Sequence, residues 1–415
     1  MLAIVGGMLI DGSGKDPVRD TVIVIDGNII REVGQKDRIK SLKECEIIDV
    51  TGMTLMPGMI DLHVHLCWGE SDTISWPHGV LVPLLDQPLI MIGLKGFAHA
   101  RKTLEMGFTT LRDLGDIGNL GVALRDSINN GLVEGPRIVA AGPYLSATGG
   151  HGDSMPPWLT RTDIVTYSAD GVDGVLKAVR QQIKMKTDWV KICATGGASI
   201  NTWDKQQFNN DELRCIIGEA HAKSRPVAAH CVHAKGTLAA VKEGADTIEH
   251  GCNLTEEIVD LMIQKGTFLV PTLFAPSALA DRGTEYGFTQ AAVETCRTIL
   301  EPHQKSFRMA LDAGVKIAFG TDAGYNPAIH GTNAFEFELL VQNGMTPMGA
   351  ILAATKNAAS ALRMGDKMGT IEKGKLADIV VVDGDPLEDI KILQDKNKIA
   401  LVIKDGSTYV NRIKC

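Results

Sequence analysis

The sequence lacks the features that would mark it as a nucleic-acid-binding or membrane protein. It contains no block of basic residues, and its formal net charge is −8 over 415 residues, which argues against a nucleic-acid partner. Its most apolar stretch, residues 79–100, is interrupted by Pro83, Asp86, Pro88 and Lys95, so no membrane span is expected there. No repeat, low-complexity tract or long linker stands out, and 44% hydrophobic residues is typical of a globular protein.

Cysteine usage gives no support to a secreted, disulfide-dependent protein. The eight cysteines form no C-x-x-C pair, and the chain is far longer than the small scaffolds that disulfides hold together. The first residues, MLAIVGGMLI, lack the basic segment of a signal peptide and have the pattern of a strand. We therefore expect reduced thiols and a cytoplasmic enzyme.

Both ends of the chain have the texture of short β-strands. Near the N-terminus the apolar, β-branched runs are residues 2–10, 21–25 and 29–33, and an Asp-Gly-Asn turn separates the last two. Near the C-terminus the corresponding runs are residues 377–382, 399–403 and 408–410. We predict that residues 1–56 and 361–415 pair into one small β-sandwich domain, which the central segment interrupts.

The middle of the chain alternates between short apolar runs and helical patterns. Eight runs read as strands, and they are residues 54–62, 109–113, 137–141, 189–194, 226–230, 247–250, 267–272 and 316–321. Eight strands separated by helices predict an α/β fold, a distorted (β/α)8 TIM-like barrel over residues 57–360.

Residues suited to metal chemistry lie at or near the C-terminal ends of these runs, where a barrel of this kind builds its active site. His63 and His65 follow the first run two positions apart, so both can face the same side. The full set is His63, His65, Lys191, His230, His250 and Asp322. Imidazole nitrogens and carboxylates are good ligands for divalent metals, and Zn(II) is the default for a site rich in histidine.

Each of these residues has a more ordinary explanation when it is taken alone. His230 and His250 could be hydrogen-bonded core histidines, Asp322 could cap the next helix, and Lys191 could extend from a strand end to solvent. A buried lysine is costly unless it is neutralised, and a lysine carbamylated by CO2 would become an anionic ligand able to bridge two cations. Together the set indicates a metal-dependent hydrolase with Asp322 as general base and then general acid.

The same positions carry a resemblance to a known family. Residues 57–65, PGMIDLHVH, resemble the opening metal motif of the amidohydrolase superfamily, and residues 374–380 resemble its closing strand. The match also includes Lys191, His230, His250 and Asp322. The resemblance implies two divalent metals: His63 and His65 on the first with Asp322, His230 and His250 on the second, and carbamylated Lys191 bridging them.

The resemblance also narrows the reaction. Members with this lysine typically hold two metals and hydrolyse amides or esters rather than deaminate. Residues 107–113, 148–153, 191–197 and 331–340 resemble a group that contains prolidases, carboxypeptidases for basic residues and ochratoxin-type amidases. His151 matches the position that helps hold the substrate carboxylate. Relatives usually have His or Tyr where this chain has Val232, so His233 is the candidate to polarise the scissile carbonyl instead.

We therefore predict a binuclear metallohydrolase that releases a C-terminal amino acid from a dipeptide or an N-acyl amino acid, a small-molecule substrate. The catalytic residues would be Asp322, His151 and His233. Residues 67–87 and 154–160 are expected to overhang the mouth of the barrel and close over the substrate. A mononuclear deaminase or cyclic amidase, and a non-catalytic binding barrel, remain alternatives. The released residue is open, and we expect a homo-oligomer.

Overall fold

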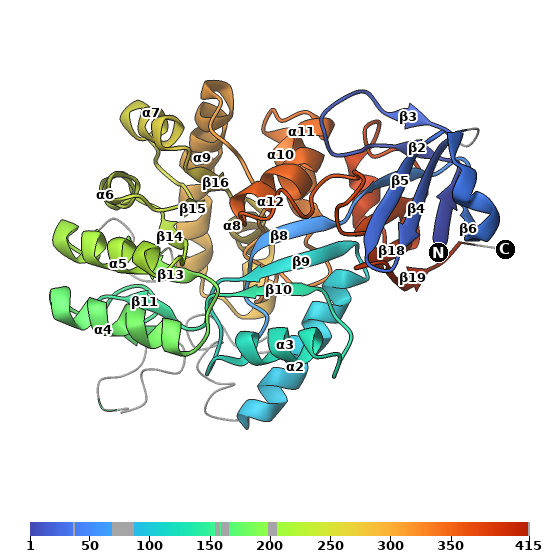
Figure 1. Cartoon of the computed structure of the whole chain (residues 1–415). Helices are drawn as coiled ribbons and strands as arrows, with labels where there is room; N and C mark the ends of the chain where they lie inside the picture. Colours follow the sequence, from blue (N-terminus) through green and yellow to red (C-terminus); the bar gives the residue numbers. More distant parts are fainter. Residues whose placement is uncertain (36–37, 69–86, 154–157, 159–165, 198–205, 414–415) are drawn as a thin grey trace. The chain divides into compact units, whose positions relative to one another are not determined.

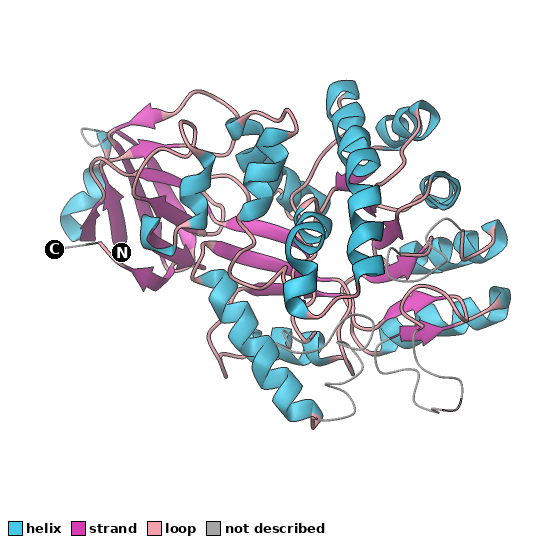
Figure 2. Ribbon diagram, turned by 180° about the vertical axis from the view of Figure 1, so that it is seen from behind, coloured by secondary structure: helices cyan, strands magenta, loops and turns pink. Residues whose placement is uncertain are grey.

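The computed structural model describes residues 1–35, 38–68, 87–153, 158, 166–197 and 206–413. The chain divides into two compact units. The first unit contains Met1–Asp61, Arg101–Thr110 and Gly331–Cys415, and the second contains Leu62–Ala100 and Leu111–His330. Figures 1 and 2 show the helices and strands of the whole chain. In the described residues, no helix is both long enough and apolar enough to cross a membrane.

The first unit contains a sheet built from both ends of the chain. Its six strands have the order β19-β18-β17-β7-β2-β3. The C-terminal strands are β17 (Ile379–Val382), β18 (Ile399–Lys404) and β19 (Ser407–Asn411), and the N-terminal strands are β2 (Met8–Leu9), β3 (Val18–Arg19) and β7 (Thr54–Pro57). β17 pairs antiparallel with β7, so the two chain ends meet in one sheet as predicted.

A second sheet of the first unit has the order β5-β4-β1-β6. Its strands are β1 (Leu2–Val5), β4 (Thr21–Asp26), β5 (Ile29–Gln35) and β6 (Glu46–Asp49). One apolar core contains residues of both sheets, among them Ile4, Leu55, Ile379 and Leu401, which are all fully buried. The single strand predicted over residues 2–10 was wrong. Gly6 and Gly7 both have positive φ, 80° and 75°, and this turn sends β1 and β2 into different sheets.

The remaining strands are short and form two further sheets. A three-stranded sheet contains β8 (Met59–Val64), β9 (Phe108–Asp113) and β10 (Arg137–Ala140). A parallel sheet has the order β12-β11-β13-β14-β15-β16. Its strands are β11 (Tyr144–Ser146), β12 (Thr166–Ser168), β13 (Val190–Cys193), β14 (Val227–Cys231), β15 (Thr247–His250) and β16 (Phe268–Val270).

The segment predicted as the last barrel strand, residues 316–321, does not form a regular strand. It makes isolated parallel bridges instead, Ile317 to Leu269 and, just beyond it, Ala323 to Val64. The backbone N–H of Ala318 donates to Leu269, and that of Leu62 donates to Phe319. The segment therefore lies between β16 and β8, where the last strand of the predicted barrel belongs. Two glycines close by leave little room for side chains: a Cβ at Gly320 would lie 2.4 Å from Val270, and one at Gly324 would lie 2.5 Å from the His65 carbonyl oxygen.

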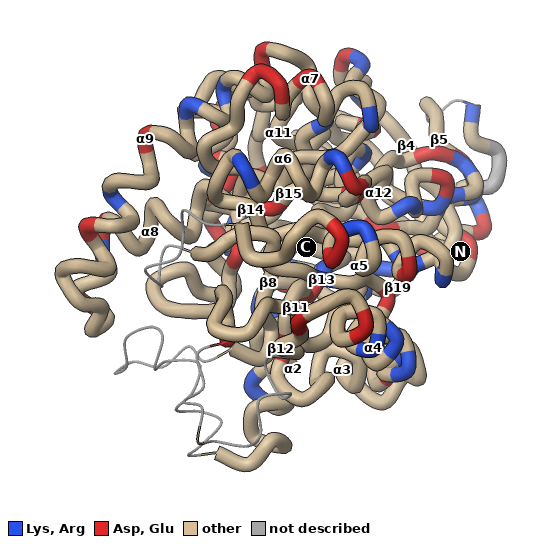
Figure 3. Tube along the Cα trace, turned by 90° about the vertical axis from the view of Figure 1, so that its left-hand side faces the viewer, with Lys and Arg blue, Asp and Glu red and all other residues tan. Residues whose placement is uncertain are grey.

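Helices follow the parallel strands and lie side by side along them (Figure 1). They are α4 (Gly171–Lys184), α5 (Asn210–Ala222), α6 (Ala234–Glu243) and α7 (Glu256–Lys265), and then α8 (Phe274–Arg282) and α9 (Gln290–Ala313). α5 begins with a complete capping box between Asn209 and Glu212. Residues of both charge signs lie on these helices (Figure 3), and Arg180–Glu219 and Arg214–Glu243 pair across neighbouring ones.

The remaining helices are α2 (Leu89–Leu104), α3 (Leu120–Asn129), α10 (Phe335–Gln342), α11 (Pro347–Leu352) and α12 (Ala358–Ala361).

The predicted α/β class is confirmed, as is the sheet that combines both chain ends. Because the parallel strands β13, β14 and β15 are adjacent and in register, Lys191, His230 and His250 are brought to one edge of one sheet.

Candidate metal centre

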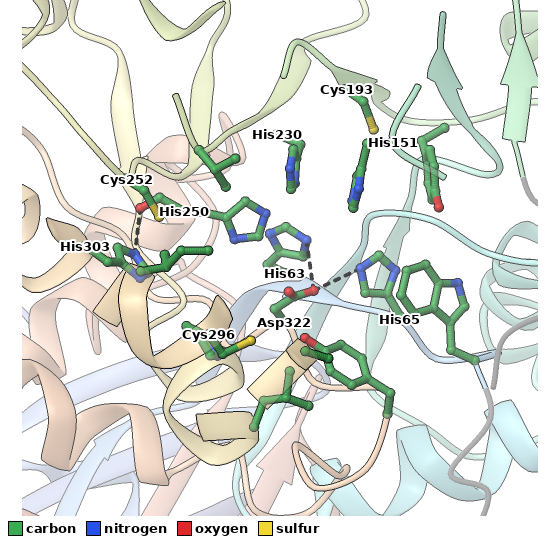
Figure 4. A pocket seen from close by; sticks show the side chains of 18 of the residues that line it. His63, His65, His151, Cys193, His230, His250, Cys252, Cys296, His303 and Asp322 are labelled. Atoms are coloured by element: carbon green, nitrogen blue, oxygen red, sulfur yellow. Dashed lines mark hydrogen bonds and ion pairs between the residues drawn. The ribbon is translucent and has the colours of Figure 1, made fainter. Parts of the chain in front are cut away.

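A cavity at the C-terminal ends of the strands gathers the residues that the sequence analysis singled out (Figure 4). The predicted metal ligands and His151 all line it. These residues are His63, His65, His151, Lys191, His230, His250 and Asp322. The ring centroid of His63 lies 5.3 Å from that of His65 and 5.0 Å from that of His250. His230 and His250 are 4.5 Å apart by the same measure.

His63, at the end of β8, is held by a buried carboxylate. Its Nδ1–H donates to Glu249 Oε2 at 2.9 Å, so the Nε2 atom is the one that faces the cavity. Glu249 is fully buried, and its other oxygen accepts hydrogen bonds from Arg112, at 2.8 Å, and from the Thr247 hydroxyl. Arg112 is also fully buried and stacks over the ring of Trp189 at 4.4 Å.

His65 is fixed on three sides. Its Nδ1–H donates to the carbonyl oxygen of Gly115 at 2.9 Å, and its ring stacks on Trp68 with centroids 3.7 Å apart. Its Nε2 lies 3.0 Å from Asp322 Oδ1, and His63 Nε2 lies 3.4 Å from the same oxygen. Asp322 therefore faces the inner nitrogens of both histidines, as the prediction of a shared first metal requires.

The two later histidines are also tied to neighbouring strands. His250 Nδ1 is hydrogen-bonded to the Thr272 hydroxyl at 2.7 Å, which leaves its Nε2 toward the cavity. His230 Nε2–H donates to the carbonyl oxygen of Gly196 at 3.2 Å, so Nδ1 is the nitrogen of this ring that can bind a metal. Burial holds the pKa values of His63, His230 and His250 well below the ordinary value, so these rings are neutral and keep a lone pair for a metal.

Three residues of the site have a backbone conformation that side chains seldom adopt. His250, Thr272 and Asp322 have φ values of 69°, 52° and 60°. Such residues cost roughly 1–3 kcal/mol each and persist where the surroundings hold them. Here the backbone N–H of Asp322 donates to the His63 carbonyl at 2.7 Å, which ties the two chain segments together at the metal centre.

Lys191, on β13, points into the same cluster. Its Nζ lies 3.3 Å from His63 Nε2, and the side chain is 3% exposed. Burial lowers the pKa of its ammonium group, although the nearby Glu249 carboxylate acts in the opposite direction. A lowered pKa increases the fraction of neutral amine, which is the form that reacts with CO2.

The donor set fits a divalent metal. The ligand atoms of His63, His250 and Asp322 lie within 4.8 Å of one another. The outer nitrogens of His63, His65 and His250 are all engaged by a carboxylate, a carbonyl or a hydroxyl, an arrangement that orients imidazoles toward a metal. Imidazole nitrogens around one carboxylate are a donor set suited to a divalent metal.

Of two predicted catalytic residues, His151 lies at the cavity and His233 does not line it. His151 lines the cavity and stacks on His230, with ring centroids 4.2 Å apart. The structure does not bring His233 together with the others. It is the N-cap of α6, where its Nδ1 accepts a hydrogen bond from the Lys235 backbone, and Val232 takes the place beside the cavity.

Sequence reasoning missed several residues of the site. Glu249 and Arg112 were not singled out, although a charged side chain in the middle of an apolar run is itself a signal that a partner exists. Tyr144 and Tyr325 line the cavity as well. Of the loops expected to cover the mouth, residues 69–86, 154–157 and 159–160 lie outside the described part of the chain, whereas Trp68 is described and packs on His65.

The comparison with known proteins decides the family. Residues 54–409 match the model of a family described as "Amidohydrolase family". The chain belongs to the amidohydrolase family. It is thus a hydrolase that acts on C–N amide bonds. Amidohydrolases generally use divalent metals, and the cluster of His63, His250 and Asp322 is the candidate site in this one.

Individual relatives are similar over nearly the whole chain. Ochratoxinase from Aspergillus niger is 32% identical over 434 residues, which cover 98% of this chain and 86% of the relative. The structure of a Xaa-Pro dipeptidase with bound methionine is 37% identical, with a TM-score of 0.87, and the match covers 99% of this amidohydrolase and 100% of that chain. A prolidase complexed with N-methylphosphonate-L-proline is 33% identical, with a TM-score of 0.89 and 99% of each chain covered.

Proposed function

We propose that this amidohydrolase cleaves the amide bond to a C-terminal amino acid in a dipeptide or an N-acyl amino acid, with two divalent metals. One observation carries the proposal: Lys191 lines the same cavity as the four histidines, with its Nζ 3.3 Å from His63 Nε2. Two prolidase-type structures and an ochratoxinase among the relatives support an amide of this kind. Zinc as the metal, a homo-oligomer and a cytoplasmic location are parts of the same proposal.

The metal ligands divide into two groups around Lys191. His63, His65 and Asp322 would hold the first metal, and His230 and His250 would hold the second. Lys191, once carbamylated at Nζ, would supply an anionic ligand that the two metals share. When bound, the two ions would polarise the scissile carbonyl and lower the pKa of the attacking water.

Asp322 is placed to move the proton that hydrolysis requires. Burial raises the pKa of its carboxyl group, but the contact with His65 and the nearby Lys191 outweigh burial and lower the pKa overall. The carboxylate therefore starts ionised. It accepts a proton from the water as that water adds to the carbonyl carbon, and it returns the proton to the amide nitrogen as the C–N bond breaks.

His151 is the proposed anchor for the carboxylate of the leaving residue. Burial lowers its pKa to about 4, so the ring is neutral near pH 7 and can donate one N–H to a carboxylate oxygen. Its Nδ1 has no hydrogen-bond partner among the described residues, and its ring lies against His230 at the edge of the cavity. The position of His233 gives no support to its predicted contact with the scissile carbonyl.

The test is a substrate library on protein loaded with Zn(II) or Mn(II). It would contain Xaa-Pro, Xaa-Lys, Xaa-Arg and Xaa-Phe dipeptides and the N-acyl forms of the same C-terminal residues. We expect release of the free C-terminal amino acid, its loss after chelation and its return with added divalent ions. The N-acyl phenylalanines test the ochratoxinase-like alternative. Release of ammonia without an amino acid would contradict the proposal and favour a deaminase.

A further inference from the structure

We infer that the acyl half of the substrate carries an uncharged, apolar group, and that one side of the cavity is built to receive it. This inference rests on the proposed function and specifies its substrate class. The receiving surface, called here the apolar wall, consists of Val232, Cys252, Leu279, Phe288, Cys296 and Ile299, all of which line the same cavity as the metal-centre residues.

The apolar wall belongs to two packed clusters. Val232, Cys252 and Ile299 form one cluster, which joins the ends of β14 and β15 to α9. Leu279, Phe288 and Cys296 belong to the other, which joins α8 to α9. Each of the six residues is at most 8% exposed, so each is packed from behind while it still borders the cavity. The wall is therefore a preformed apolar surface.

None of the six residues of the wall is acidic or basic, and the polar groups among them are the thiols of Cys252 and Cys296. Burial raises the pKa of the Cys296 thiol to about 12, so this thiol stays protonated. His303 borders the same cavity. Its Nε2–H donates to the carbonyl oxygens of His250 and Pro271, at 2.9 and 2.7 Å. An ammonium or carboxylate group placed against this wall would lose its hydration without gaining an opposite charge.

The position of the wall assigns it to the acyl half. Figure 4 shows His151 on one side of the cluster formed by His63, His250 and Asp322, whereas Cys252, His303 and Cys296 lie on the other side. If the carboxylate of the leaving residue is at His151, the scissile carbonyl at the metal centre directs the other half of the substrate toward the wall. Tyr325, which packs on the Leu279 cluster, lines the same cavity.

A matched pair of substrates tests the inference on the metal-loaded enzyme. N-hexanoyl-L-proline and N-(6-aminohexanoyl)-L-proline have the same acyl chain length and differ by a terminal ammonium group. We expect kcat/KM to be at least about 100-fold lower for the ammonium compound. From acetyl to hexanoyl, kcat/KM should rise by about threefold for each added CH2 group. Equal rates for the two six-carbon compounds would overturn the inference and leave the proposed function standing.

A binding measurement separates a failure of the inference from a failure of the proposed function. Hexanoate and 6-aminohexanoate are titrated into the metal-loaded protein by calorimetry. Tighter binding of hexanoate, by about tenfold or more, supports the wall even if no N-acylproline is hydrolysed. Equal affinity of the two acids, or tighter binding of 6-aminohexanoate, contradicts it.

Variants locate the effect. Ile299→Glu places a carboxylate in the wall, and Thr298→Glu places one at an exposed position of the same helix. We expect Ile299→Glu to shift the selectivity ratio by about 30-fold or more toward the ammonium substrate, while Thr298→Glu leaves it unchanged. The same shift in both variants would contradict a local wall. If Ile299→Glu fails to fold, Leu279→Ala serves instead, and it should lower kcat/KM about tenfold for the hexanoyl substrate but not for the acetyl one.

Discussion

Asp322→Asn is expected to lower kcat by a factor of about 10² to 10⁴ while the protein keeps its fold, because an amide cannot accept and return the proton. The substitution keeps the size of the side chain and one oxygen that can face His65 and His63, which lie 3.0 and 3.4 Å away. Steady-state kinetics on metal-loaded protein, with metal content determined on the same samples, measures the effect.

Asp281→Asn is the matched control, because Asp281 is an exposed carboxylate of α8 that does not line the cavity. Its kcat should stay within about twofold of that of the unmodified protein. If Asp322→Asn retained normal turnover with full metal content, Asp322 would not be the proton carrier. If the variant lost its metal along with its activity, its role as a ligand would be supported and the proton transfer would need a separate test from the pH profile.

Arg112→Met is expected to have the largest effect on stability, a loss of about 3–5 kcal/mol in the free energy of unfolding. Arg112 and Glu249 are both fully buried and lie 2.8 Å apart, so removal of the guanidinium takes away the cation that is hydrogen-bonded to a buried carboxylate. Urea unfolding of metal-free protein measures the loss without a contribution from metal binding.

Arg180→Met provides the comparison. Arg180 pairs with Glu219 at the same distance of 2.8 Å, but its side chain is 60% exposed, so its removal should have a much smaller effect on the free energy of unfolding than the removal of Arg112. The double variant Arg112→Met with Glu249→Gln should recover part of the loss, since no charge is then left unpaired. Equal effects of Arg112→Met and Arg180→Met would show that the buried pair has no special weight.

Much of the candidate site could be predicted because its chemistry is local in the sequence. His63, His230 and His250 each end a short apolar run, and parallel strands bring the ends of such runs to one edge. The position of Asp322 followed from the same rule, even though the run before it makes only isolated bridges. A residue at the end of an apolar run could therefore be predicted as a site residue even where that run does not form a regular strand.

Other features depend on contacts between residues far apart in the chain. Glu249 and Arg112 are 137 positions apart, and the residues around one of them do not indicate that it pairs with the other. The apolar wall combines residues from the ends of two strands and from two later helices, and each looks like an ordinary core residue in its own segment. His233 was proposed because relatives usually have His or Tyr where this chain has Val232, but in the structure His233 is the N-cap of α6 and its ring accepts a hydrogen bond from the Lys235 backbone.

Strand limits were also set by backbone effects that the apolar pattern does not show. The run at residues 54–62 was read as one strand, yet β7 ends at Pro57 and β8 begins at Met59. A Cβ on Gly58 would lie 2.2 Å from the Thr109 hydroxyl, so the chain changes direction at a residue with no side chain. This break lets β7 join the sheet of both chain ends while β8 carries His63.

Anomalous X-ray scattering from crystals grown with saturating zinc tests the central claim most directly. The account predicts two zinc peaks, one beside the Nε2 atoms of His63 and His65 with Asp322, and one beside His230 and His250. It also predicts density for a carboxylate on Lys191 Nζ that reaches both ions. A single peak with an unmodified lysine, or no peak at either position, would contradict the binuclear centre on which the proposed reaction depends.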